Sequence, residues 1–230
     1  MSLGRGKLRY EFAFVDLAAR CQYACKGCFN QEINASGASL SRVQLRNIVD
    51  FLSERGGRVI TFAGSGEPLL DPEMLPLIEY AHKKGINSVL FSSLTYEKRG
   101  RILPIDQDLV EKLYDLDVWI VAKRNTLDNQ KQAEILGKPR SNVGEVMHEA
   151  LSRVIDVGFA SEGRLLMDCP IDQFTIAEVP DLLRFCREID ILPYFESYII
   201  HGQERTTLQS HKITPRELEE LFRKLKIIDQ

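Results

Sequence analysis

The sequence predicts an α/β fold, a six-stranded partial (β/α)6 barrel with parallel strands. Two observations lead to this prediction. Short strand-like runs of apolar residues recur along the chain, and an amphipathic helical pattern separates each run from the next. Strands that alternate with helices form parallel sheets with right-handed crossovers, and such sheets tend to curl into full or partial barrels.

The expected strands are rich in β-branched, aromatic and other apolar residues. In chain order they lie at 10–17, 58–63, 87–93, 117–122, 163–168 and 191–200. Between them, stripes of apolar residues at helical spacing predict helices, most clearly over 45–52 and 143–155. Both stripes are expected to pack against the sheet.

Helix starts are predicted from capping signals. Asp71, Pro72 and Glu73 combine a cap with a first-turn proline, and Thr175 with Glu178 fits a capping box. A second box, beginning at Thr214, opens the last helix, which is expected near 214–226.

The longest connection between predicted elements runs from Lys123 to Asn142 and is rich in charged and amide residues. Connections of this length are often functional. We expect this one to fold over a site.

Composition indicates a single globular domain, residues 1–230, with 44% hydrophobic and 27% charged residues. A net charge of −3 provides no general field for nucleic acid or an anionic membrane. The apolar runs are far shorter than the roughly 20 residues of a membrane helix. Because the first residues also lack an apolar signal core, we expect a cytoplasmic protein.

Three of the five cysteines cluster as Cys21-x3-Cys25-x2-Cys28, directly after the first expected strand. Such a cluster in a reducing compartment indicates metal binding or catalysis rather than a disulfide framework. Structural zinc requires four ligands, whereas a four-iron cluster held by three thiolates leaves one iron open to a small molecule. A zinc site completed by a distant histidine and a group of free thiols remain the alternatives.

A glycine-rich loop, Gly64-Ser65-Gly66-Glu67, follows the second expected strand. Its glycines allow the backbone to approach a ligand closely, and Pro68 restricts the conformation of Glu67. The carboxyl ends of parallel strands meet at one edge of a sheet. We therefore expect this loop and the cysteines to lie at the same rim.

Together, the cysteine spacing and the Gly-Glu-Pro loop resemble the radical S-adenosylmethionine superfamily. The last expected strand, 191–200, resembles that of the molybdenum-cofactor and peptide-maturase lineage, here without its C-terminal auxiliary-cluster domain. The resemblance implies a 4Fe-4S cluster and S-adenosylmethionine as cofactors. It also implies reductive cleavage of S-adenosylmethionine to a 5′-deoxyadenosyl radical, which abstracts hydrogen from a substrate inside the barrel.

The resemblance also implies roles for individual residues. The implied cluster ligands are Cys21, Cys25 and Cys28, and the implied cofactor-binding residues are Gly64, Ser65, Gly66, Glu67, Ser92, Ser93 and Lys123. Within this set, Glu67 is the anionic partner of the cofactor's amino group. The two serines and Lys123 are placed to meet its ribose or carboxylate.

Four residues at the ends of the fifth and sixth expected strands are candidates for the substrate pocket: Asp168, Cys169, Glu196 and His201. For Cys169, which precedes a proline, packing is the alternative role. Cys186 lies on an apolar helix stripe and is expected in the core. Since these last two cysteines alone cannot ligate a second cluster, we expect an external electron donor of the flavodoxin or ferredoxin type.

The resemblance leaves the substrate open between a small molecule and a peptide. One alternative function is a glycyl-radical-enzyme activase, although the Asp-x-Lys of such activases is replaced by Val121-Ala122-Lys123. A second alternative is a non-catalytic iron–sulfur or zinc scaffold. The chain is either a minimal enzyme or a truncated piece of a longer one.

Overall fold

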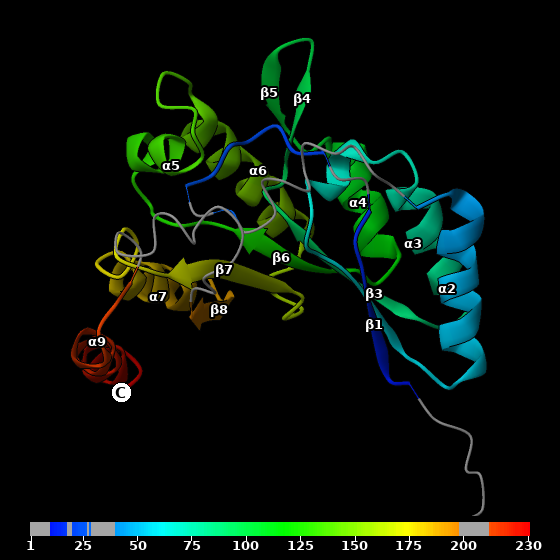
Figure 1. Ribbon diagram of the computed structural model, residues 1–230. Coiled ribbons are helices and arrows are strands. Elements are labelled where there is room, and N and C mark those ends of the chain that lie inside the picture. The colour runs from blue at the N-terminus through cyan, green and yellow to red at the C-terminus, as the bar shows by residue number, and fades with distance from the viewer. Residues whose placement is uncertain (1–9, 18–19, 27, 29–39, 198–211) are drawn as a thin grey trace, which may run out of the picture.

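A six-stranded parallel sheet organises the chain (Figure 1). The computed structural model describes residues 10–17, 20–26, 28, 40–197 and 212–230. The strands of the sheet are β1 (Phe12–Val15), β2 (Val59–Phe62), β3 (Asn87–Ser92), β6 (Trp119–Lys123), β7 (Leu165–Ile171) and β8 (Leu192–Ser197). They pair in chain order, with β1 and β8 at the two edges, which confirms the predicted parallel α/β fold.

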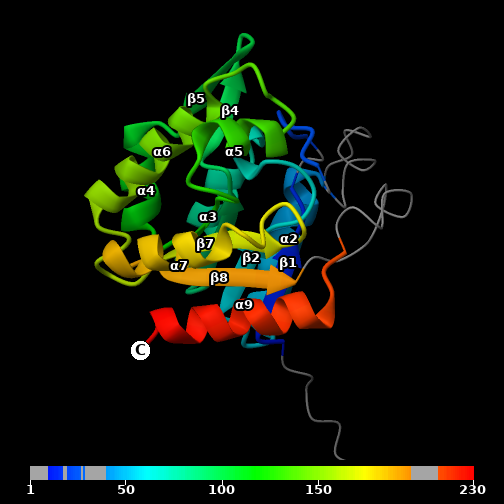
Figure 2. The same cartoon turned by 90° about the vertical axis from the view of Figure 1, so that its left-hand side faces the viewer.

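Helices follow the strands, as the alternating pattern predicted (Figures 1 and 2). They are α2 (Arg42–Glu54), the short 3-10 helix η1 (Pro68–Leu70), α3 (Met74–Lys83), α4 (Gln107–Asp115), α5 (Asn129–Ile135), α6 (Val143–Val157), α7 (Val179–Glu188) and α9 (Pro215–Ile228). In the described part of the chain, no helix is both long enough and apolar enough to cross a bilayer.

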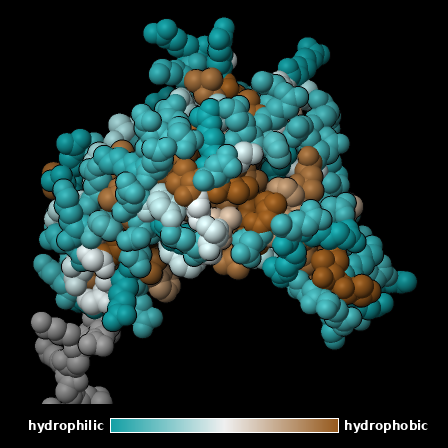
Figure 3. Space-filling model, turned by 180° about the vertical axis from the view of Figure 1, so that it is seen from behind, coloured by the Kyte–Doolittle hydropathy of each residue, from teal (hydrophilic) through white to brown (hydrophobic). Residues whose placement is uncertain are grey.

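The two faces of the sheet differ in what covers them. On the outer face, side chains such as Ile60, Leu90 and Ile120 are fully buried and share one core with the surrounding helices. On the inner face, register aligns Phe14 with Trp119, and their exposed fractions are 69% and 38%. Apolar patches also remain visible on the molecular surface (Figure 3). Among the described residues, helices therefore pack fully against the outer face and leave the inner face partly uncovered.

The sheet is strongly curved. Phe91 on β3 and Tyr194 on β8 are separated by two strands, yet their ring centroids lie 5.6 Å apart. In a flat sheet, three strand spacings would put them about 14 Å apart. Their contact across the inner face shows that the sheet curls into the predicted partial barrel.

Two of the predicted helix starts can be compared at the level of single residues. The capping box of Thr214 and Glu217 is present at the start of α9, as predicted. By contrast, Asp71, Pro72 and Glu73, which were predicted to cap and open a helix, form the turn before α3, and the helix itself begins at Met74. Within that turn the Asp71 carboxylate accepts a bond from Glu73 N (2.8 Å).

The capping box predicted for Thr175 and Glu178 does not form. The Glu178 carboxylate instead accepts bonds from Thr126 Oγ1 (2.6 Å) and Lys131 Nζ (2.7 Å). The prediction was wrong because these donors, about 50 residues away in the chain, are supplied only by the tertiary fold.

The long connection between β6 and α6 contains α5, a helix that the sequence patterns did not reveal. They also missed a hairpin of β4 (Thr95–Lys98) and β5 (Arg101–Pro104), which pair antiparallel outside the main sheet. Both elements are short, so their apolar patterns are too brief to predict them.

The end of α5 holds the cysteine loop in place. Ala24 N donates to Leu136 O (3.3 Å), and Lys26 N donates to Ile135 O (2.9 Å). Gly137 follows with φ +71°, and a Cβ atom there would lie 2.6 Å from Ala24 O. This position therefore requires glycine both for its backbone conformation and for the close approach of the cysteine loop.

We expect Gly137→Ala to displace the cysteine loop. Gly163→Ala is the matched control, since Gly163 also has positive φ but nothing near its Cβ position. Each variant should lose about 1–2 kcal/mol of stability from the left-handed backbone alone. Only Gly137→Ala should lose more and make the thiols of Cys21 and Cys25 react faster with a disulfide reagent in the metal-free protein. Equal thiol reactivity in the two variants would contradict this role.

Candidate functional site

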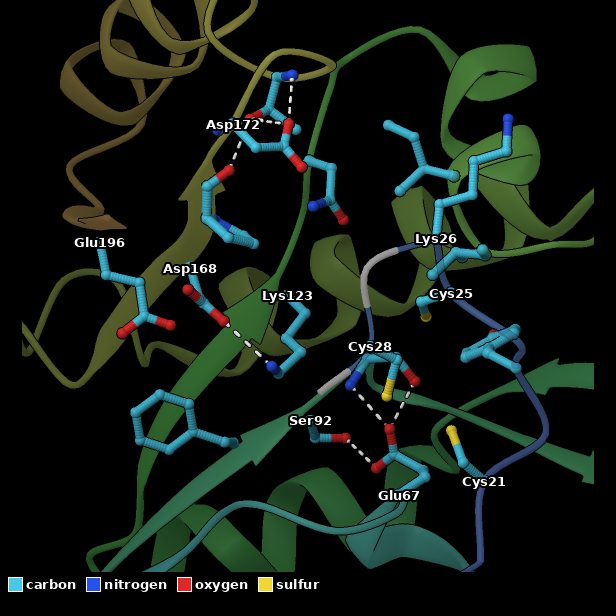
Figure 4. Close-up of a pocket in the computed structure, with 18 of the residues that line it drawn as sticks. Cys21, Cys25, Lys26, Cys28, Glu67, Ser92, Lys123, Asp168, Asp172 and Glu196 are labelled. Carbon is cyan, nitrogen blue, oxygen red and sulfur yellow. Dashed lines mark hydrogen bonds and ion pairs between the residues drawn. The ribbon is translucent and has the colours of Figure 1, made fainter. Parts of the chain in front are cut away.

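One cavity lies at the carboxyl ends of the strands, where the cysteine loop meets the loop after β2 (Figure 4). Of the residues predicted from sequence, those that line it are Cys21, Cys25, Cys28, Gly64, Gly66, Glu67, Ser92, Ser93, Lys123, Asp168 and Glu196. Residues from six separate segments therefore converge on one site. This convergence follows from the parallel sheet, whose strands all end at the same edge.

Glu67 lies at the centre of this convergence and is 4% exposed. Its Oε1 accepts bonds from Ser92 Oγ (2.6 Å) and Leu69 N (3.3 Å). Its Oε2 accepts bonds from the backbone N (2.9 Å) and Oγ (2.6 Å) of Ser93. Burial raises the pKa of the Glu67 carboxyl, against the hydrogen bonds, which lower it. The carboxylate joins the end of β3 to the loop after β2.

The glycine-rich loop is also tied to the end of β1. Ser65 N donates to Asp16 Oδ1 (3.2 Å), and Gly64 adopts φ +103° where a Cβ atom would collide with the same oxygen. Ser65 itself is buried and does not line the cavity, unlike the glycines on either side of it.

The cysteine loop is anchored on both sides of Cys21. Before it, Arg20 O accepts a bond from Glu67 N (2.7 Å). After it, Gln22 Nε2 donates to Thr95 O (2.8 Å), and the Tyr23 hydroxyl shares a short hydrogen bond with Thr95 Oγ1. The loop that carries the thiols is thus linked directly to the Glu67 loop and to β4.

The three thiols face the same cavity in a largely buried setting. Burial raises the pKa of Cys21 to about 11 and that of Cys25 to about 12, so both thiols are protonated at neutral pH in the absence of metal. Iron binding would displace these protons.

The thiol arrangement fits a four-iron cluster. Among the described residues, no three His, Cys, Asp or Glu side chains are grouped closely enough to hold one metal ion. Zinc would need such a group, whereas each thiolate of a four-iron cluster binds a different iron atom. Cys21, Cys25 and Cys28, which all line the cavity, are the residues that would hold such a cluster.

Lys123 and Asp168 face each other across neighbouring strands (Figure 4). Lys123 Nζ lies 3.3 Å from Asp168 Oδ2, and their side chains are 51% and 1% exposed. Although partial burial works against its charge, the attraction of Asp168 keeps the pKa of Lys123 above its ordinary value. Burial raises the pKa of Asp168, and Lys123 opposes that rise.

The other substrate-pocket candidates have different positions. Glu196 lines the cavity from β8. Cys169 is fully buried on the outer face of β7, which corrects its candidacy for the pocket, because its side chain alternates away from that of Asp168. Cys186 is buried in the core, with Sγ 3.7 Å from Met167 Sδ. His201 lies outside the described residues.

Several residues of the site were not predicted from sequence. Gln22, Tyr23 and Thr95 connect the cysteine loop to β4, and Phe174 receives the Lys26 ammonium 5.8 Å from its ring centroid at the cavity wall. The positions of Gln22, Tyr23 and Lys26 within the cysteine motif were the available signals. The others act through contacts between distant segments.

Comparisons with known proteins agree with this geometry. The family model of the 4Fe-4S single cluster domain matches residues 4–142, more than half of the chain. No curated protein sequence matches significantly. Among solved structures, SuiB of Streptococcus suis bound to S-adenosylmethionine is similar, with 16% identity, a TM-score of 0.69 and 96% of this chain covered.

Two further structures are similar in fold. The anSMEcpe structure with bound AdoMet and the Cp18Cys peptide has 15% identity, a TM-score of 0.66 and 94% of this chain covered. HydG, described as a maturase of the [FeFe]-hydrogenase, has 13% identity, a TM-score of 0.64 and 97% coverage. This chain covers 44%, 59% and 50% of SuiB, anSMEcpe and HydG, respectively.

The extent of the family match and the six parallel strands, which carry three cysteines at their common edge, lead to one conclusion. The chain belongs to the 4Fe-4S single cluster domain family, and it shares its fold with SuiB, anSMEcpe and HydG.

Proposed function

We propose that this chain is the core domain, residues 1–230, of a radical S-adenosylmethionine enzyme. Cys21, Cys25 and Cys28 hold the 4Fe-4S cluster, and the loop ending in Glu67 receives S-adenosylmethionine. The observation that supports this most directly is that all three cysteines and Glu67 line one cavity at the carboxyl edge of the sheet.

When bound, the cluster and S-adenosylmethionine supply reductive cleavage to a 5′-deoxyadenosyl radical, which abstracts hydrogen from the substrate. The chain's own residues bind and orient these cofactors and form the walls of the cavity. The anchored cysteine loop keeps the thiols in one wall of the cavity, and the curved sheet lines the cavity with Phe91.

Glu67 becomes available to a cofactor ammonium through Ser93. The four hydrogen bonds that Glu67 accepts occupy its lone pairs in the free protein. However, Ser93 Oγ also lies 2.9 Å from Thr95 Oγ1. A turn of this hydroxyl toward Thr95 frees one position on Glu67 Oε2 for the ammonium, while Lys123, half exposed in the same cavity, is placed to bind the carboxylate or ribose.

The substrate is a small molecule or a peptide. SuiB has been solved with its precursor peptide SuiA, which makes a peptide one option for this chain too. The electron comes from an external donor of the flavodoxin or ferredoxin type, because Cys169 and Cys186 are both buried and apart from the cavity that would hold a cluster. We propose a cytoplasmic enzyme that uses neither nucleic acid nor a membrane.

Two activity measurements distinguish the proposed function from the two alternatives, the activase and the non-catalytic scaffold. Production of 5′-deoxyadenosine after reduction by dithionite distinguishes an enzyme from an iron–sulfur or zinc scaffold. Hydrogen transfer to a glycine of a partner protein distinguishes an activase from an enzyme that acts on another substrate.

We expect Cys25→Ala to abolish assembly of the four-iron cluster without unfolding the protein, because Cys25 lies in a loop outside the main core. Cys186→Ala is the matched control, since that thiol is buried in the main core. Iron and sulfide analysis after anaerobic reconstitution should give about four of each per chain for the wild type and the control. Full iron content with intact cofactor cleavage in Cys25→Ala would refute the ligand assignment.

We expect Glu67→Gln to weaken S-adenosylmethionine binding about ten- to a hundredfold, since hydrogen bonds to charged groups contribute about 1.5–3 kcal/mol. Stability should also fall, because the new amide group presents hydrogen atoms to the donors of Ser92 or Ser93. Iron content should not change. Equilibrium dialysis measures the affinity, and Glu79→Gln, on the surface of α3, is the control. An affinity equal to that of the control would limit Glu67 to a structural role.

A further inference from the structure

We propose that Asp168 and Glu196 bind a protonated amine or guanidinium group of the substrate. This inference rests on the proposed function to the extent that the cavity is the place where a substrate is held. It adds the chemical class of that substrate, which neither the family nor the fold specifies.

Asp168 is buried and faces the cavity without a hydrogen-bond donor. Its residue exposure is 1%, and within the described part of the chain neither carboxylate oxygen has a hydrogen-bond partner. The Lys123 ammonium lies 3.3 Å from Oδ2, as an ion pair. A buried carboxylate that has one ion pair and no well-aligned hydrogen bond remains under-satisfied, so its position at the cavity wall favours a ligand that supplies a further donor.

Strand register places Glu196 next to this carboxylate. Asp168 pairs with Tyr194, and Glu196 follows two residues later on the same inner face of β8. Both acids line the cavity and point into the same region (Figure 4). Partial burial of its carboxyl and the nearby charge of Asp168 raise the pKa of Glu196, because the two negative charges repel each other. A cation between them would relieve this repulsion.

The remaining acids of the cavity are already engaged. Glu67 accepts four hydrogen bonds, and Asp172 accepts bonds from the backbone N atoms of Phe174 (2.8 Å) and Thr175 (2.9 Å). The acidic surplus that a ligand meets is therefore concentrated at Asp168 and Glu196. Two lysines also line the cavity among the described residues, but the Lys26 ammonium lies over the Phe174 ring, which leaves Lys123 facing both carboxylates, and one lysine does not neutralise two carboxylates.

The apolar surroundings also suit an amine on a hydrocarbon stem. Tyr194 is opposite Asp168 in register, and its ring meets that of Phe91, which lines the cavity. A cation near these rings gains attraction from their faces, and its stem packs against them. An anionic substrate group between Asp168 and Glu196 would be repelled by both carboxylates, and a neutral group there would leave their charge uncompensated.

Calorimetric titration of the cluster-loaded full chain with benzylamine tests the proposal, with benzyl alcohol as the neutral analogue. Benzylamine should bind with a dissociation constant on the order of 1 mM, and the alcohol at least about tenfold more weakly. Asp168→Asn and Glu196→Gln should each weaken amine binding about tenfold or more. The control Asp181→Asn, which removes an exposed carboxylate on α7, should bind like the wild type.

Folding of the variants is checked by thermal unfolding. Asp168→Asn should melt close to the wild type, because the loss of the ion pair with Lys123 is offset by the lower cost of burying a neutral amide in place of a carboxylate. Glu196 is exposed, so Glu196→Gln provides a second variant whose fold is not at risk. Equal binding of amine and alcohol, or unchanged amine affinity in both site variants, would overturn the proposal.

A capped Gly-Lys-Gly peptide identifies the source of the amine. Tighter Asp168-dependent binding of the peptide than of benzylamine assigns a basic peptide side chain, and weaker binding assigns a free amine. Both outcomes support the amine site. The proposed function is tested separately: formation of 5′-deoxyadenosine without amine binding would overturn only this inference, and Asp168-dependent amine binding without 5′-deoxyadenosine would overturn only the proposed function.

Discussion

The buried carboxylate of Glu67 is the interaction on which the site's geometry depends. A carboxylate removed from water must find donors, and Glu67 finds them on Ser92 and Ser93 at the end of β3. Its own backbone N binds Arg20 O, immediately before the first cysteine. One residue thus fixes the distance between the cysteine loop, the glycine-rich loop and the third strand. The cavity exists because these three segments cannot move independently.

The alternation of side chains along parallel strands then divides the sheet into a structural and a chemical side. The odd and even positions of β7 illustrate this division, since Met167 and Cys169 enter the core while Asp168 faces the cavity. On the inner face, polarity rises toward the carboxyl end, where Lys123 and Glu196 replace the apolar Trp119 and Leu192. Function is concentrated where helices leave the sheet uncovered and the strands end.

Much of this arrangement was predictable from sequence, and the failures have a common cause. The strands, the capping box of Thr214 and the meeting of Cys21 with Glu67 at one edge all follow from local patterns and from the rule that parallel strands end together. The box expected at Glu178 failed because Thr126 and Lys131, distant in sequence, bind its carboxylate. The hairpin of β4 and β5 was not predicted because its strands are too short to show a clear alternation of apolar and polar residues.

The sequence by itself determined the fold class, the family motif and the edge of the sheet at which the chemistry gathers, because periodicity and ligand spacing are properties of neighbouring residues. Tertiary structure alone decided which side chains have partners. It gave Glu67 four donors and left Asp168, equally acidic and equally buried, with an ion pair and no hydrogen bond in the described part of the chain. That difference arises from contacts between strands far apart in the sequence, so no local pattern encodes it.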